Sequence, residues 1–166
     1  MQIRDERPQD AAAISRITTA AFDKALHSSG TEARIVEALR QAGALTVSLV
    51  TTSDDGDIVG HVAFSPVQID RTPGRWYGLG PVSVTPDLQR QGIGGALIRE
   101  GLARLAAMNA DGCVLLGDPA YYSRFGFVSD PALTYGGKPS PYFQRLVFKG
   151  GSQKGDVSYH SAFDVE

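Results

Sequence analysis

The chain has 166 residues, the size of one domain with a single substantial core. Hydrophobic residues make up 42% of the chain and charged residues 20%, a composition that excludes an intrinsically disordered protein. The net charge is −2 and acids and bases are interspersed, so no basic footprint indicates a nucleic-acid partner. With neither an N-terminal apolar signal region nor an apolar run of about 18 residues, we expect a cytoplasmic protein with no membrane partner. The one cysteine, Cys113, lies in the apolar run CVLLG and is interpreted as a buried structural thiol.

The N-terminal part of the chain predicts one short strand and two helices. Ile3 among charged neighbours indicates a strand, and Pro8 favours a helix start soon after it. Apolar residues recur at helical spacing over residues 11–22. A second helix is expected to begin after Thr31 and to end before Gly43.

Residues 44–86 change from helical to strand periodicity. The runs ALTVSLVTT and DIVGHVAFSPVQI flank the Asp-Gly turn in SDDGD, so we expect them to pair as an antiparallel hairpin. A third strand is expected over RWYGLGPVSVTP, with a break or bulge caused by Gly78, Gly80 and Pro81.

The C-terminal half predicts a helix between two strands. An amphipathic helix is expected from Ile93 to Met108 and a short buried strand from Cys113 to Leu116, which together with the preceding strand predict a parallel crossover. Further on, Pro119 begins a short helix, YGGKPSP is a loop, and FQRLVFK is a strand. The element order predicts an α+β (mixed α/β) fold in which a mixed, mostly antiparallel sheet has helices on both faces.

We expect a single domain over residues 1–166. Its core is expected over residues 1–150. Residues 151–166 remain open, as either a last strand or an ordered tail.

The segment TPDLQRQGIGGAL concentrates glycine between a strand and a helix. Gly92, Gly94 and Gly95 allow close approach to the first amides of the helix, where the helix dipole adds about half a positive charge. The turn is therefore an anion site suited to a diphosphate. The side-chain donors at its rim are Gln89, Arg90 and Gln91. The alternative is a flexible turn that only enters a helix. A P-loop is excluded because no lysine follows the glycines, and the spacing also departs from a dinucleotide fingerprint.

At this loop the sequence resembles the GNAT superfamily of N-acetyltransferases, whose signature is Gln or Arg, two residues, Gly, one residue, and Gly or Ala. Gln89, Gly92 and Gly94 occupy the three defined positions. Downstream, AYYSRFGF matches the family's Tyr, three residues, Gly and Phe, beginning at Tyr122. By element order the resemblance covers residues 1–130, and GDPAYYSRFGF is similar to a branch of small N-acetyltransferases.

The resemblance implies acetyl-coenzyme A as co-substrate, a GNAT-like sheet and no metal. The pantetheine arm would pair as an extra strand with the backbone at Val82, Ser83 and Val84, and the diphosphate would bind the glycine loop. The implied loop residues are Gln89, Arg90, Gln91, Gly92, Ile93, Gly94 and Gly95. The acetyl group would pass by direct attack in a ternary complex to a primary amine of a small molecule or a protein, and an amide near Val82 would bind the oxyanion.

Tyr122 is the expected acid toward the departing thiolate, because a phenol with a reference pKa near 10 is protonated at neutral pH. The alternative is an aromatic that packs the short helix on the sheet, together with Tyr121 and Phe125. The base is open. His61 and Asp118 are the candidates, and their structural alternatives are a buried core histidine and a cap of the next helix.

Two positions depart from the family pattern. The strand RWYGLGPVSV has no carboxylate where some members carry one, and Gly117 and Asp118 stand where many relatives have a cofactor-contacting asparagine. Because the binding motif is intact while no base is evident, a non-catalytic acyl-coenzyme A binding or sensing domain is the alternative function. The loop LHSSGTEARI between the first two helices and the C-terminal segment are expected to line the acceptor site. Glu32 and Arg34 of this loop either contact the acceptor or are solvated at a helix start. The oligomeric state is open, a homodimer being one alternative.

Overall fold

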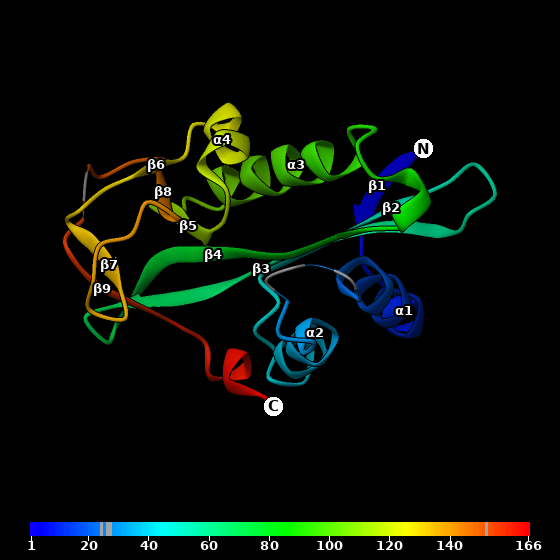
Figure 1. Cartoon of the computed structure of the whole chain (residues 1–166), viewed down its shortest axis with the longest axis horizontal. Coiled ribbons are helices and arrows are strands. Elements are labelled where there is room, and N and C mark those ends of the chain that lie inside the picture. Colours follow the sequence, from blue (N-terminus) through cyan, green and yellow to red (C-terminus); the bar gives the residue numbers. More distant parts are fainter. Residues whose placement is uncertain (24, 26–27, 152) are drawn as a thin grey trace.

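The computed structural model describes residues 1–23, 25, 28–151 and 153–166. A central sheet crosses the molecule, with α1 (Ala11–Phe22) and α2 (Glu32–Gln41) on one face and α3 (Ile93–Ala107) and α4 (Pro119–Tyr122) on the other (Figure 1). Over the described residues the strands are β1 (Gln2–Asp5), β2 (Val47–Thr52), β3 (Ile58–Ile69), β4 (Thr72–Val84), β5 (Gly112–Leu116), β6 (Val128–Ser129), β7 (Leu133–Tyr135), β8 (Phe143–Val147) and β9 (Gly155–Tyr159). The predicted α+β fold with helices on both faces is confirmed.

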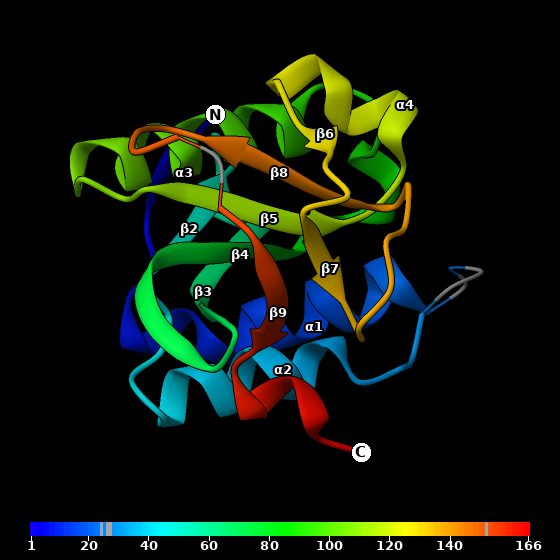
Figure 2. The ribbon, with the colours of Figure 1, turned by 90° about the vertical axis from the view of Figure 1, so that its left-hand side faces the viewer.

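The strand order is β1-β2-β3-β4-β5-β8-β6, and β9 pairs with both β3 and β7. The predicted antiparallel hairpin is β2 with β3, and the predicted parallel crossover runs from β4 through α3 to β5. The segment after residue 150 contains a last strand, β9, and then the 3-10 turn Ser161–Asp164, which lies against α2 (Figure 2). The prediction missed β6 and β7 because strands of two and three residues are too short to show alternation.

The predicted break in β4 is a bulge at Gly80 and Pro81. Val62 of β3 lies opposite Val82, but Phe64 lies opposite Leu79, so β4 contains one residue more than β3 over this stretch. Gly80 has φ of +131°, a left-handed conformation that only glycine adopts readily.

Beyond this bulge, β4 and β5 part. Their parallel ladder joins Trp76–Gly78 to Gly112–Val114 and goes no further, while β5 continues to Leu116 beside β8. Among the described residues, the last part of β4 up to Val84 therefore has a partner strand on its β3 edge alone. An edge with unpaired backbone groups in the middle of a sheet is where an extended ligand can bind.

Helix α3 lies close to the sheet because Gly101 has no side chain. A Cβ atom built at Gly101 would overlap the ring of Phe64, which is fully buried in the main core. None of the helices in the described part of the chain is both long and apolar enough to cross a membrane.

We expect Gly101→Ala to lower the free energy of unfolding by about 1–3 kcal/mol, because the new methyl group overpacks the contact between α3 and β3. Urea denaturation measures the change. Gly74→Ala is the control, since a Cβ there meets no atom within 4 Å. Equal stability of the two variants would contradict the close contact.

Candidate functional site

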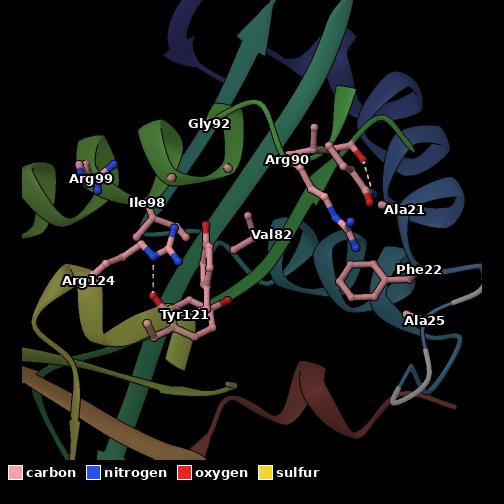
Figure 3. Close-up of a pocket in the computed structure, with 15 residues that line it drawn as sticks. Ala21, Phe22, Ala25, Val82, Arg90, Gly92, Ile98, Arg99, Tyr121 and Arg124 are labelled. Carbon is pink, nitrogen blue, oxygen red and sulfur yellow. Dashed lines mark hydrogen bonds between the residues drawn. The ribbon is translucent and has the colours of Figure 1, made fainter. Parts of the chain in front are cut away.

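A cleft of about 630 Å³, called the large cleft here, lies between the first turn of α3, the end of β4, the end of α1 and the α4 turn (Figure 3). It is lined by Ala21, Phe22, Ala25, Val82, Val84, Gln89, Arg90, Gly92, Gly94, Gly95, Ile98, Arg99, Tyr121, Tyr122 and Arg124. Most of the loop and strand residues that the sequence singled out are thus brought together at one place.

The first turn of α3 presents free backbone amides to the large cleft. Gly92 is the N-cap residue, with φ of +90° and no capping side chain, and the first helical bond joins the amide of Ala96 to the Gly92 carbonyl at 3.0 Å. The amides of Ile93, Gly94 and Gly95 have no acceptor among the described residues. A helix N-terminus with free amides favours an anion, so this turn can hold a phosphate group.

Three arginines add positive charge to the large cleft. Arg90, Arg99 and Arg124 line it, and its described lining contains no Asp or Glu. The Arg99 guanidinium lies 4.9 Å from the centre of the Phe125 ring, and that of Arg124 lies 4.3 Å from the centre of the Tyr121 ring. Arg124 also donates a hydrogen bond of 2.9 Å to the Tyr121 carbonyl (Figure 3). The charge of the cleft suits a ligand with several phosphates.

The prediction from sequence missed Arg99 and Arg124. Arg99 follows Gly95 by four residues, so it stands one helical turn above the anion site, and that spacing is a signal in the sequence. Arg124 lies in the 3-10 turn after α4, and its position beside the large cleft depends on how α4 folds back, for which the sequence carries no local signal.

The end of β4 offers alternate faces to its surroundings. Val82 and Val84 line the large cleft, whereas Ser83 is buried on the other face, with its hydroxyl 3.3 Å from that of Thr18 in α1. Ser83 therefore presents only its backbone to a ligand at this edge. Gln89 donates to the Val84 carbonyl at 3.0 Å, which ties the loop to the strand end.

Two of the predicted loop residues do not line the large cleft. Gln91 is exposed beside it, and the Ile93 side chain is buried in the core under α3, so Ile93 offers only its amide.

Tyr122 lies between the large cleft and a neighbouring one. Its ring makes edge contacts with Tyr121 and Phe127, at centroid distances of 4.9 and 6.3 Å. Its hydroxyl has no hydrogen-bond partner among the described residues. Burial, reinforced by the nearby Tyr121, raises the pKa of Tyr122 to about 12, so the phenol keeps its proton at neutral pH.

The second cleft, called the small cleft here, has a volume of about 410 Å³. It shares Phe22, Val82 and Tyr122 with the large cleft. Its other walls come from the β4 bulge, α2, β5, β7, β9 and the C-terminal turn, and consist of Glu32, Ile35, Leu79, Gly80, Pro81, Leu116, Tyr135, Tyr159 and Phe163. The two clefts therefore meet at the end of β4.

The geometry gives no support to the base roles predicted for His61 and Asp118, neither of which lines a cleft. His61 is fully buried and shares a 2.8 Å hydrogen bond with the Ser48 hydroxyl. Desolvation by burial lowers the pKa of His61 to about 4 in spite of Glu6 at 3.8 Å. Asp118 is exposed and caps α4 by accepting a 3.0 Å hydrogen bond from the Ala120 amide.

The structural interpretation of Cys113 is confirmed. The residue is fully buried, and burial raises the pKa of its thiol. Over the described ranges, no group of three or more His, Cys, Asp or Glu side chains is placed to hold a metal ion.

The chain is similar to known acetyltransferases over most of its length. Residues 46–129 match the family profile described as the acetyltransferase (GNAT) domain. The N-acetyltransferase YhbS of Escherichia coli strain K12 is 42% identical over 127 residues, which cover 76% of this chain and 73% of that protein.

Two solved structures extend the likeness to almost the whole chain. A GNAT family acetyltransferase from Brucella melitensis, in complex with acetyl-CoA, is 54% identical, with a TM-score of 0.87 and coverage of 98% of this chain and 97% of that one. YhbS from E. coli in complex with CoA is 35% identical, with the same TM-score of 0.87 and coverage of 99% and 92%. The chain therefore belongs to the GNAT superfamily of N-acetyltransferases and is an acyltransferase.

Proposed function

We propose that this protein transfers the acetyl group of acetyl-coenzyme A directly to a primary amine of a small molecule or a protein, within a ternary complex. One observation carries the proposal: the large and small clefts meet at Val82 and Tyr122. A thioester donor in one cleft and an amine in the other would bring their reacting atoms to the same point.

The large cleft has the donor groups that acetyl-coenzyme A requires. The diphosphate binds the free amides of Ile93, Gly94 and Gly95, with the neighbouring Arg90 as a charged partner. The pantetheine arm runs along the free edge of β4 at Val82–Val84 and pairs with it as an added strand. Acetyl-CoA in the Brucella relative supports this assignment.

In the reaction, the neutral amine nitrogen attacks the thioester carbonyl carbon, a C–N bond forms and the C–S bond breaks. A backbone amide near Val82, at the β4 bulge, stabilises the oxyanion. The Tyr122 hydroxyl gives its proton to the departing thiolate and regains one of the protons that the amine gives up. An ammonium substrate gives up two protons overall, of which one ends on the coenzyme A sulfur and the other is released to solvent. No protein base is assigned.

The test is a thiol-release assay with acetyl-coenzyme A and a panel of small and peptidic amines, combined with calorimetry of acetyl-coenzyme A binding. Thiol release that requires an amine, with mass-spectrometric detection of the amide, is the expected result. Binding of acetyl-coenzyme A without turnover of any amine would instead favour a sensing domain.

We expect Gly94→Leu to raise the dissociation constant for acetyl-coenzyme A by about tenfold or more, an effect of about 1.4 kcal/mol. A Cβ at Gly94 would lie 3.6 Å from Val84 and 3.8 Å from Val82, so the larger side chain would occupy the large cleft without a clash in the core. Calorimetry measures the constant, and Gly74→Leu, on the exposed start of β4, is the control. Unchanged affinity in Gly94→Leu would remove this turn from the binding site.

A further inference from the structure

The small cleft combines aromatic walls with one charged side chain. Five rings line it, and that of Tyr159 lies 5.4 Å from Tyr135 and 5.0 Å from Phe163, centroid to centroid. Glu32, at the start of α2, is the one ionisable carboxylate among its described lining residues, which include no Lys, Arg or His. The small cleft is thus an apolar, aromatic chamber with a single negative charge.

The Glu32 carboxylate is held in place by hydrogen bonds from neighbouring residues. Its Oε1 atom accepts a 2.7 Å hydrogen bond from the Ser28 hydroxyl, and Oε2 accepts two of 3.1 Å from the amide and hydroxyl of Ser29. The backbone amide of Glu32 itself adds to these bonds. Arg34, two residues on, bonds instead to the Glu166 carbonyl and does not neutralise Glu32.

The same hydrogen bonds keep Glu32 ionised. Burial alone would raise the pKa of Glu32, but the hydrogen bonds from Ser28, from its own amide and from Ser29 outweigh this effect, and the pKa is lowered. A fixed carboxylate beside aromatic faces attracts a cation, both through the charge and through the rings.

We propose that the acceptor is a compact primary amine with an aromatic or apolar body and no carboxylate, selected by Glu32 and by the rings of Tyr135, Tyr159 and Phe163. This inference rests on the proposed function and narrows its acceptor to a small molecule. The volume of about 410 Å³ suits such a ligand.

Amines that carry a carboxylate or more than one positive charge fit the small cleft less well. An amino acid brings a carboxylate that is repelled by Glu32 and meets no cationic side chain among the described lining residues. A polyamine carries several positive charges. Glu32 can pair with one of them, and the apolar walls would desolvate the others without offering a partner.

The experiment compares kcat/KM for 2-phenylethylamine, phenylalanine, spermidine and a lysine-containing peptide at saturating acetyl-coenzyme A. We expect 2-phenylethylamine to exceed each of the others by about tenfold or more, the value of a hydrogen bond to a charged group. Glu32→Gln should raise the KM for 2-phenylethylamine by about tenfold and shrink its advantage over phenylalanine, with the affinity for acetyl-coenzyme A unchanged.

Two controls separate selectivity from folding. Glu37→Gln removes a carboxylate from the same helix that bonds to Arg40 at 2.6 Å and lines neither cleft, so its kinetics should match the unaltered protein. Tyr135→Leu removes one ring that is 42% exposed, and should raise the KM for 2-phenylethylamine about 2- to 10-fold while leaving that for propylamine unchanged.

Equal effects of Glu32→Gln and Glu37→Gln, or a preference for phenylalanine, spermidine or the peptide, would overturn the inference and leave the proposed function intact. Absence of thiol release with every amine, despite binding of acetyl-coenzyme A, would overturn both.

Discussion

Replacing Tyr122 by phenylalanine is expected to lower kcat by about two to three orders of magnitude, the usual contribution of a positioned acid. Affinity for acetyl-coenzyme A should not change, because the α3 amides proposed to bind its diphosphate lie elsewhere in the large cleft. The ring contacts with Tyr121 and Phe127 are retained by phenylalanine, and the lost hydroxyl has no hydrogen-bond partner among the described residues. Thermal stability should therefore be unaffected. Steady-state kinetics and calorimetry measure the two quantities.

The pH profile supplies a second check on Tyr122. With a pKa of about 12, the phenol stays protonated through the alkaline range in which amines become neutral, so kcat/KM should rise with pH and show no fall before about pH 10. Tyr142→Phe, at a tyrosine that is 60% exposed, is the matched control for kcat. If Tyr122→Phe turned over as fast as this control, Tyr122 would have a structural role only.

Acidification below pH 6.5 is expected to lower the free energy of unfolding by about 3 kcal/mol through the buried His61, and most of this loss is reached near pH 4. His61 has a folded pKa of about 4, set mainly by burial, against about 6.5 in the unfolded chain. The unfolded state therefore binds more protons between these values, and stability falls as pH falls through this window. Urea unfolding at pH 7 and pH 4 measures the loss.

The comparison variant is His61→Gln, which cannot take up a proton. The difference in stability between the two proteins should shift by about 3 kcal/mol from pH 7 to pH 4 and stay constant between pH 7 and pH 8.5. Glu6 lies 3.8 Å from the imidazole but is bound by Arg40 at 2.8 Å and by the Ser48 hydroxyl. A charged His61 paired with Glu6 would predict the opposite sign, with stability gained on acidification.

Much of the fold could be predicted because each of the longer elements carries a local signal in its own sequence. Apolar periodicity placed α1, α2 and α3, the Asp-Gly turn placed the β2–β3 hairpin, and Gly80 with Pro81 marked the bulge in β4. The short strands β6 and β7 escaped because they are defined by their partners β8 and β9 and not by their own residues.

The parts of the candidate site that could be predicted are those whose residues lie next to one another in the sequence. The glycine turn and Tyr122 lie in single short segments, and both line the large cleft. The walls of the small cleft come from α2, β4, β5, β7 and β9 and meet only through the sheet topology, so no local pattern assembles them. The burial of His61 could not be predicted either. A strand residue points to one face of the sheet or the other, and the composition of the strand does not say which. The catalytic and binding roles of these residues remain predictions.

The shared wall at Val82 and Tyr122 has an evolutionary consequence. Apart from that wall and Phe22, the small cleft is built from parts of the chain that take no part in the large one, chiefly α2, β7, β9 and the final turn. Under the proposed function, substitutions there change which amine binds while the residues proposed to bind acetyl-coenzyme A stay constant, so related proteins with near-identical glycine turns need not share an acceptor.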